Sequence, residues 1–242
     1  MIIDWIFFDA GNTLIGLDYS LVVRALWEHG FRVDEIHLRR AELTARRDLD
    51  RTILERWKQG PLPRTGWVEA RVWRNFWRQV LELCGTSPAG SEALVETVLE
   101  VTRPASSWDR VASSTVPLLE DLTQRGYRLG IISNSNGTLL HQLERLGLAG
   151  RFDVIIDSAH AGVEKPHPEI FNIALQKAGG VDPGRALYIG DVYAIDVLGA
   201  ASAGMHAALF DPYGQWGPGM GPAGAPDCRA LADLAELSTM LE

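Results

Sequence analysis

The sequence contains only two cysteines, Cys84 and Cys228, among its 242 residues. They lie far apart and outside any C-x-x-C spacing, so the sequence predicts neither a disulfide framework nor a thiolate metal site. No apolar run approaches the ~18 residues that a membrane-spanning helix needs, and Asp4 stands where an export signal needs basic residues. We therefore expect a cytoplasmic protein with no membrane partner.

Positive charge is also scarce, because 23 Lys plus Arg face 31 Asp plus Glu, giving a formal net charge of -8. Nucleic acid is not expected as a partner, since phosphate backbones need a basic face. The deficit is uneven: residues 16–104 carry 14 basic and 13 acidic residues, so the excess of acid belongs to the rest of the chain. This difference indicates a near-neutral insert in an acidic body.

The chain begins with a short apolar run, residues 2–8, that is rich in β-branched and aromatic side chains. Such a run is typical of a buried strand, and Asp9-Ala10-Gly11-Asn12-Thr13 after it predicts a tight turn. From residue 19 to about 104, apolar residues recur at steps of three and four, which indicates helices. Breaks that contain glycine or proline divide this region into about four helices, and they fall at Gly30, 60–63 and 85–90.

Beyond Trp108 the pattern alternates between helices and strands, as expected of a parallel sheet with crossover helices. The strands are expected at 128–132, 153–156, 186–189 and 206–210, and the helices at 116–125, 139–146, 170–178, 194–203 and 230–241. A loop rich in glycine and proline, 214–226, precedes the last helix. The predicted fold class is α/β: a doubly wound, Rossmann-like parallel sheet (the core, 1–15 and 105–242) with an inserted all-helical cap (16–104).

Ligands of doubly wound sheets bind at the carboxyl ends of the strands, and polar residues follow four of the expected strands. Asp9 ends the first strand, where its carboxylate could act as a nucleophile or bind a metal. The backbone N–H groups of the turn at Gly11, Asn12 and Thr13 could receive anionic oxygens. Alone, this segment is equally an ordinary Asp-Gly-Asn turn.

Ser133 and Asn134 follow the second of these strands, where a hydroxyl and an amide can donate to phosphoryl oxygens, although both residue types also cap helices. Lys165 lies in a loop stiffened by Pro166 and Pro168. Its ammonium could neutralise a carboxylate and a developing phosphoryl charge.

Asp191 closes a further strand, and Asp196 lies five residues on, near the start of a helix. Together with Asp9 they form an all-oxygen set of the kind that Mg²⁺ prefers. Asp196 could otherwise be a favourable acid near a helix N-terminus.

These four segments occur in order at successive strand ends, and the set resembles the haloacid dehalogenase superfamily, subfamily I, whose members carry a helical cap after the first motif. Asp9 to Thr13 matches the first motif in part, Ser133 the second, Lys165 the third and Gly190-Asp191 to Asp196 the fourth. The resemblance spans nearly the whole chain. It implies a hydrolase, a phosphatase of small phosphorylated substrates.

The resemblance also implies a role for each matching residue. Asp9 would be the nucleophile that forms an aspartyl intermediate, and Ser133 and Lys165 would hold the phosphoryl oxygens. Mg²⁺ would be bound by Asp9, the Gly11 carbonyl, Asp191 and Asp196. Phosphatases of this family usually have a second aspartate, the general acid and base, two residues after the nucleophile, where this chain has Gly11.

The substitution at Gly11 keeps alternatives open. Haloacid dehalogenases proper also lack the second aspartate, but they need no metal, and the retained Asp191 and Asp196 argue against that activity. A phosphonate-cleaving relative would need a cap lysine, and Lys58 is the only one in the cap. A catalytically impaired binding or regulatory protein is a third alternative.

Five of the eight tryptophans, Trp27, Trp57, Trp67, Trp73 and Trp77, lie in the cap. Helix packing is the usual reason for such residues, but they could also line a specificity pocket or form a homodimer contact. The sequence leaves both a monomer and a homodimer open.

We predict that turnover depends steeply on the acidity of the leaving group, because a missing general acid costs about 10²- to 10⁴-fold in rate. Acyl phosphates and p-nitrophenyl phosphate should react, whereas simple alkyl phosphates should scarcely react. Rates measured across a leaving-group series test this, and Gly11→Asp should flatten the dependence. A flat dependence in the unmodified protein would mean that another group supplies the proton.

Overall fold

The structure is a computed structural model that describes residues 2–60, 63–66, 70–214, 216 and 228–241. The strands are β1 (Trp5–Phe8), β2 (Gly16–Leu17), β3 (Trp108–Arg110), β4 (Arg128–Ser133), β5 (Val154–Asp157), β6 (Ala186–Gly190), β7 (His206–Phe210) and β8 (Arg229–Leu231). The α-helices are α1 (Tyr19–Glu28), α2 (Glu35–Lys58), α3 (Ala70–Leu83), α4 (Pro88–Thr102), α5 (Thr115–Gln124), α6 (Leu139–Arg145), α7 (Ser158–Ala161), α8 (Pro168–Lys177), α9 (Leu198–Ser202) and α10 (Glu236–Met240). Shorter turns are η1 (Ala105–Ser107), η2 (Ala149–Arg151), η3 (Pro183–Arg185) and the π-helical turn η4 (Tyr193–Val197).

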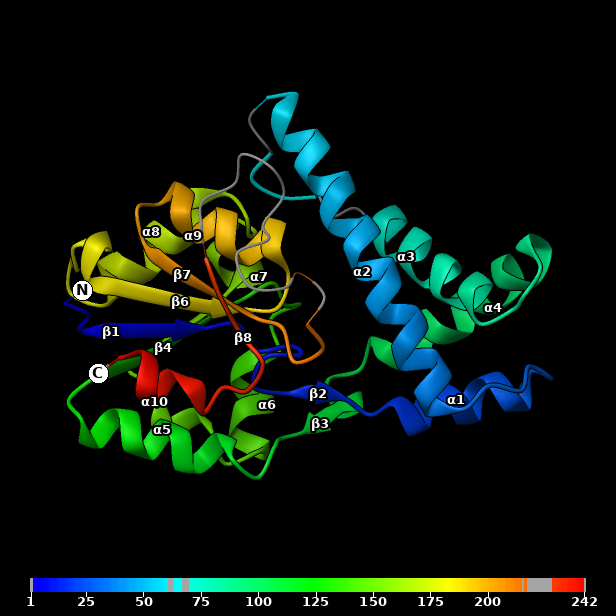
Figure 1. The fold of residues 1–242 in the computed structure, drawn as a ribbon, viewed down its shortest axis with the longest axis horizontal. Helices are drawn as coiled ribbons and strands as arrows, with labels where there is room; N and C mark the ends of the chain where they lie inside the picture. Colours follow the sequence, from blue (N-terminus) through cyan, green and yellow to red (C-terminus); the bar gives the residue numbers. More distant parts are fainter. Residues whose placement is uncertain (1, 61–62, 67–69, 215, 217–227, 242) are drawn as a thin grey trace.

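A six-stranded sheet of parallel strands, in the order β5-β4-β1-β6-β7-β8, forms the core. β1 lies inside it, with Phe8 opposite Ile131 of β4 and Ile189 of β6. Helices α5, α6 and α10 pack on one face of the sheet, and α8 and α9 pack on the other (Figure 1). The doubly wound α/β fold is therefore confirmed, and the residues that follow β1, β4 and β6 lie at one edge.

Two features of the fold differ from the sequence-based prediction. The helix expected at 230–241 is wrong at its start, because residues 229–231 form β8 and only 236–240 are helical. Pairing with the open edge of β7, with Ala208 opposite Arg229, outweighs the helical preference of the alanine-rich segment. The sequence analysis also missed β2 and β3, which pair antiparallel where the chain enters and leaves the cap.

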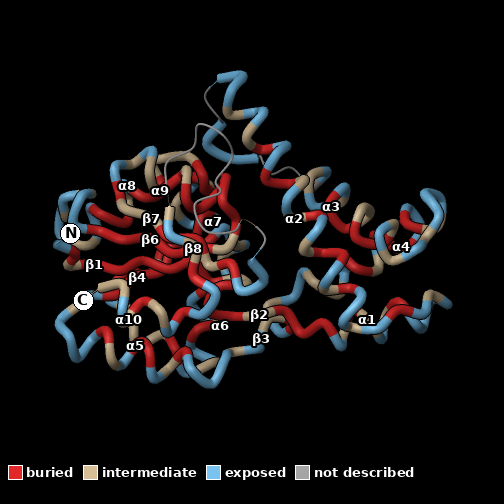
Figure 2. The backbone as a smooth tube through the Cα atoms, in the orientation of Figure 1, coloured by how far each residue is buried: buried red, intermediate tan, exposed pale blue. Residues whose placement is uncertain are grey.

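The four helices expected between residues 19 and 104 are present as α1 to α4. They enclose an apolar cluster, seen as buried stretches facing one another in Figure 2, and Val192, Ala194 and Ile195 of the core also belong to it. Aspartates stand at the start of two of them: Asp18 accepts a hydrogen bond from Ser20 N, and Asp34 accepts one from His37 N. None of the described helices has the length and apolar character needed to cross a membrane.

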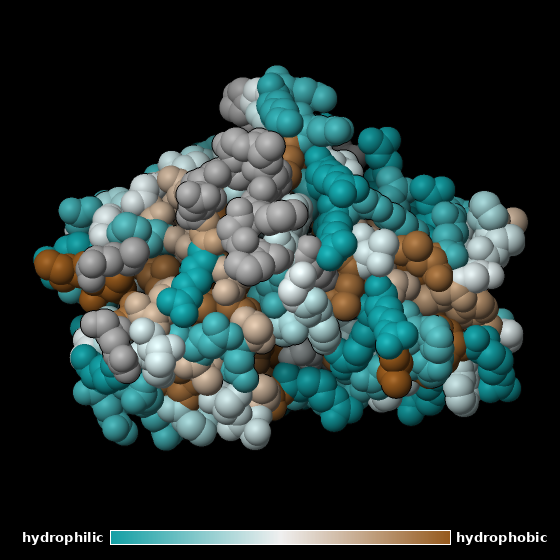
Figure 3. Space-filling view, viewed as in Figure 1, coloured by the Kyte–Doolittle hydropathy of each residue, from teal (hydrophilic) through white to brown (hydrophobic). Residues whose placement is uncertain are grey.

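Helix α2 reaches the core, as does the cap segment at Arg64, whose carbonyl accepts from Glu164 N at 2.7 Å. The 24 residues of α2 correspond to about 36 Å of helix, and its outer face is hydrophilic (Figure 3). On its inner face, Asp50 accepts a hydrogen bond from Ala194 N in η4 at 2.7 Å. A cap helix thus contacts the segment of the core that follows β6. Trp67, one of the cap tryptophans, and most of the loop predicted at 214–226 lie outside the described residues.

Candidate active site

Asp9 is the residue around which the candidate site is built. It directly follows β1, and its backbone N–H donates to the Ile189 carbonyl of β6 at 2.8 Å. The chain then turns sharply, with Asn12 in the left-handed region (φ 56°) and with Leu14 N and Ile15 N both donating to Ala10 O. The turn places the buried Asp9 carboxylate at the edge of the sheet.

Lys165 is brought against this carboxylate from the loop before α8. Its Nζ donates to Asp9 Oδ1 at 2.7 Å, to Asp196 Oδ1 at 2.7 Å and to the Tyr188 hydroxyl at 2.9 Å. The Tyr188 hydroxyl in turn donates to the Ile132 carbonyl at 3.0 Å. With its side chain only 3% exposed, Lys165 is a fixed cation inside the site.

Asn134 holds Lys165 in place. Its Oδ1 accepts from Lys165 N at 2.7 Å, and its Nδ2 donates to Lys165 O at 2.9 Å. Both side-chain polar atoms therefore contact the Lys165 backbone, and Asn134, whose amide keeps a second N–H, also lines the cavity. Ser133 lines the cavity as well, and its hydroxyl makes no hydrogen bond to any residue that the structure describes.

Asp191 and Asp196 complete the carboxylate cluster. The Asp196 side chain folds back so closely that a Cβ on Gly190 would lie 2.2 Å from its Cγ, which explains the glycine before Asp191. Its Oδ2 accepts from Val192 N at 2.9 Å. Ligand oxygens of Asp9, Asp191 and Asp196 all lie within 4.8 Å of one another.

Burial controls the ionisation of this cluster. It raises the pKa of Asp9 to about 7, against the attraction of Lys165, and the neighbouring Asp196 and Asp191 raise it further. Burial also raises the pKa of Asp191, which the Arg46 guanidinium opposes. Burial alone would lower the pKa of Lys165, but the carboxylates of Asp196 and Asp9 outweigh it and raise that pKa. Lys165 therefore stays charged.

The cap adds three charged side chains that the sequence analysis did not assign: Glu42, Arg46 and Asp50. They stand four residues apart on one face of α2. Arg46 pairs with Asp191 across the boundary between cap and core, and its Nη2 also donates to Glu42 Oε1 at 2.9 Å. The spacing was visible in the sequence, but a row of charges on a helix more often faces solvent.

The donor set fits a divalent cation. Around the cluster, five carboxyl groups face two cations, Lys165 and Arg46. The three that converge, those of Asp9, Asp191 and Asp196, offer only oxygen ligands, which Mg²⁺ prefers. Negative charge in excess and oxygen ligands together are what a magnesium site needs.

A cavity of about 490 Å³ opens over the cluster, between the strand ends and the cap. Its floor includes Asp9, Gly11, Asn12, Ser133, Lys165, Asp191 and Asp196. Its other lining residues include Arg46, Trp73, Phe76 and Trp77 of the cap and Trp108 of β3. Thr13 does not line it, and the buried Thr13 hydroxyl has no hydrogen-bond partner among the described residues. Lys58 is exposed at the end of α2, away from the cavity, so nothing here supports a phosphonate-cleaving lysine.

The family model for haloacid dehalogenase-like hydrolases matches residues 3–204. The chain belongs to this family. It is therefore a hydrolase by family, and the expected resemblance is confirmed.

Among curated relatives, the glyceraldehyde 3-phosphate phosphatase of Methanothermobacter thermautotrophicus is 42% identical over 101 residues, which cover 40% of this chain and 43% of that relative. The chain thus spans less than half of that protein. Pyrimidine 5'-nucleotidase YjjG of Escherichia coli is 27% identical over 98% of this chain and 97% of its own length. Among solved structures, the putative HAD-hydrolase YfnB of Bacillus subtilis, described as bound to magnesium, matches with a TM-score of 0.68 and 18% identity, covering 100% of both chains. At that identity the match shows the fold.

We predict that Arg46→Ala lowers the free energy of unfolding by about 3–5 kcal/mol, because it leaves the buried Glu42 and Asp191 carboxylates without their cation. Urea denaturation at neutral pH measures this. The matched control is Arg51→Ala on the same helix, which removes only an exposed pair with Asp48 and should cost less than about 1 kcal/mol. Equal losses of unfolding free energy in the two variants would show that the Arg46 contacts stabilise the protein no more than an exposed ion pair does.

Proposed function

We propose that this hydrolase is a Mg²⁺-dependent phosphatase of a small phosphorylated metabolite and that it works through an aspartyl-phosphate intermediate on Asp9. The observation that carries the proposal is the convergence of Asp9, Asp191 and Asp196 on one point beside Lys165 at the floor of the cavity. Both a nucleophilic carboxylate and a cation site are available there. We further propose that residues 16–104 act as a cap that covers this floor.

In the proposed complex, the Ser133 hydroxyl, the Lys165 ammonium and the Gly11 backbone N–H receive the phosphoryl oxygens. The expected roles of Asn12 and Thr13 are not carried into the proposal, because Asn12 N donates to Ile15 O at 2.8 Å and Thr13 does not line the cavity. Asp9, the Gly11 carbonyl, Asp191 and Asp196 would hold Mg²⁺. When bound, the metal supplies positive charge that offsets the negative charge of the phosphoryl group. Asn134 contributes by fixing the backbone of Lys165.

The reaction then has two steps. Asp9 Oδ attacks phosphorus, the bond between phosphorus and the leaving oxygen breaks, and that oxygen departs with the electron pair and takes a proton from water. Water next attacks phosphorus of the aspartyl phosphate, and the bond between phosphorus and Asp9 Oδ breaks with its electron pair returning to the carboxylate. The inorganic phosphate that leaves keeps one proton of the attacking water and gives the other to the hydroxide left by the first step. Lys165 remains within hydrogen-bond distance of Asp9 and stabilises the anionic charge in both steps.

The names of the relatives support phosphoryl chemistry. A glyceraldehyde 3-phosphate phosphatase and a pyrimidine 5'-nucleotidase both remove phosphate from small molecules, although the first aligns with less than half of this chain. The three converging carboxylates disfavour a metal-independent dehalogenase. Turnover itself would separate the proposal from a binding or regulatory role on the same fold.

Asp9→Asn should lower the turnover of p-nitrophenyl phosphate in Mg²⁺ by about 10³-fold or more, because it removes the nucleophile while preserving size. Phosphate release is the measurement, and chloride release from a 2-haloacid is assayed alongside it. The matched control is Asp4→Asn at the other end of β1, whose exposed pair with Arg185 lies away from the cavity and whose activity should stay unchanged. Near wild-type activity in a folded Asp9→Asn variant, or chloride release without phosphate release, would contradict the proposal.

A further inference from the structure

The cap side of the cavity decides which leaving groups fit, and this inference rests on the proposed function. In an in-line displacement the leaving group lies opposite the nucleophile. Asp9 lies at the floor, so the leaving group points toward the opposite wall. The cap lines the cavity there with Trp73, Phe76 and Trp77 of α3, and Trp108 of β3 lines it next to Gly11 of the floor.

Trp108 lies directly beside Gly11. A Cβ built on Gly11 would be 3.5 Å from Cζ3 and 3.9 Å from Cε3 of the indole, in ordinary van der Waals contact. Gly11 does not have a positive φ, so its backbone would accept a side chain. The indole therefore lies in contact with the point at which a side chain at position 11 would begin.

The position of Trp108 is fixed from both parts of the molecule. Its Nε1 donates to Thr102 O at the end of α4 at 2.8 Å, and its carbonyl accepts from Gln142 Nε2 of α6 at 2.9 Å. It also packs against the apolar clusters of both cap and core. An indole held by these contacts presents a preformed surface to a ligand.

Across the cavity, the rings of α3 form a connected group. Phe76 contacts Trp73 edge-to-face with centroids 5.6 Å apart, and it contacts Trp77 edge-to-face at 5.3 Å. Phe76 and Trp77 are buried, whereas Trp73 is 39% exposed. A ligand between Trp108 and this group would meet aromatic surface on two sides.

We propose that Trp108 is a specificity-determining residue and that, with the aromatic group of α3, it forms a subsite selecting phosphorylated substrates whose leaving group carries a planar ring. A ring in this subsite gains stacking contacts that a saturated group of similar size does not gain. The expected preference is about two- to twelvefold in kcat/KM, the range that aromatic pairs give. Small polar leaving groups leave the aromatic walls without a partner.

The test compares benzoyl phosphate with cyclohexanecarbonyl phosphate. The two leaving groups are carboxylates of similar acidity and size, and their departure needs no general acid, so the comparison isolates the planar ring from a proton donor at position 11. The unmodified enzyme should prefer the benzoyl compound, mainly through KM. Trp108→Leu should bring the ratio of the two kcat/KM values close to one, and Trp108→Phe should retain part of the preference.

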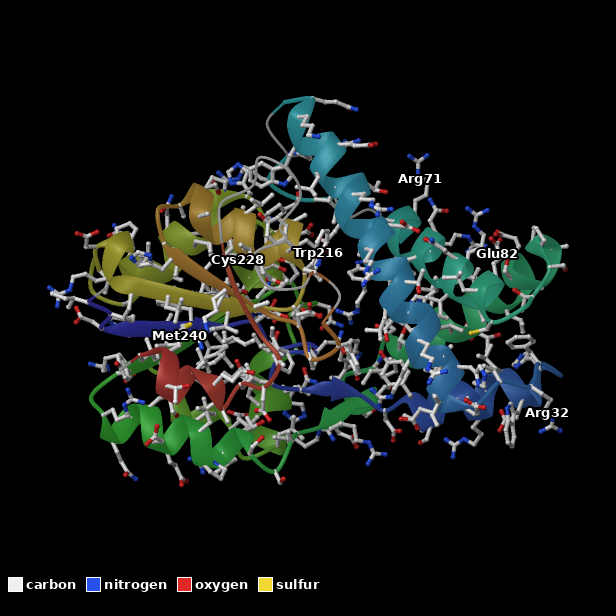
Figure 4. The ribbon with its side chains drawn as sticks, in the orientation of Figure 1. Arg32, Arg71, Glu82, Trp216, Cys228 and Met240 are labelled. Atoms are coloured by element: carbon white, nitrogen blue, oxygen red, sulfur yellow. The ribbon has the colours of Figure 1, made fainter. Side chains whose placement is uncertain are left out.

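Trp27→Leu is the matched control, because Trp27 is 44% exposed and does not line the cavity. Its ring stacks with Arg32, which lies at the end of the cap away from the core (Figure 4). An unchanged ratio in folded Trp108→Leu would overturn the inference. Should that variant not fold, a ratio near one in the unmodified enzyme would overturn it equally. No turnover of any phosphate ester or acyl phosphate in Mg²⁺ would instead be a failure of the proposed function.

Discussion

The structure depends on keeping three carboxylates together at one edge of a sheet, with side chains that are each at most 10% exposed. Like charges at such distances repel, and burial removes the water that would otherwise solvate them. Lys165 compensates Asp9 and Asp196 from the loop before α8, and Arg46 compensates Asp191 from the cap. The sheet supplies the convergence, because β1 and β6 are neighbours and end at the same edge. A divalent cation would complete the neutralisation.

The need to compensate the charge of these carboxylates also joins the cap to the core. Helix α2 contacts the segment after β6 through polar groups: Arg46 reaches Asp191, and Asp50 accepts from Ala194 N. Burial raises the pKa of Asp50 to about 7, which the Ala194 hydrogen bond opposes. The cap therefore borders the candidate metal site as well as enclosing the cavity. The proposed chemistry at the floor and the proposed recognition by the aromatic residues would both depend on one arrangement of cap and core.

Much of the fold was predictable because its signals are local. Period-3.6 and strand patterns gave the cap helices and the order of the core strands. Polar residues at strand ends and one loop lysine indicated Asp9, Asp191 and Lys165, which the structure brings together. Arg46 was missed because nothing in the sequence of α2 shows that this charge faces a carboxylate 145 residues away. Trp108 was not linked to Gly11 for the same reason. β8 was missed because its pairing with β7, which outweighs the helical preference of the alanine-rich segment, cannot be seen in the local sequence. Long-range contacts determine these three features, which the local sequence pattern does not specify.

Calorimetric titration with Mg²⁺ across a range of pH tests the central claim most directly, since metal binding requires ionised carboxylates. Burial raises the pKa of Asp9 to about 7, so its carboxyl group is ionised above that pH and increasingly protonated below it. We predict one Mg²⁺ bound per chain at about pH 8, with an affinity that falls as the pH is lowered through about 7 and with proton release on binding. No binding at about pH 8, or an affinity that is unchanged down to about pH 5.5, would contradict the assignment of the carboxylate cluster as a metal site.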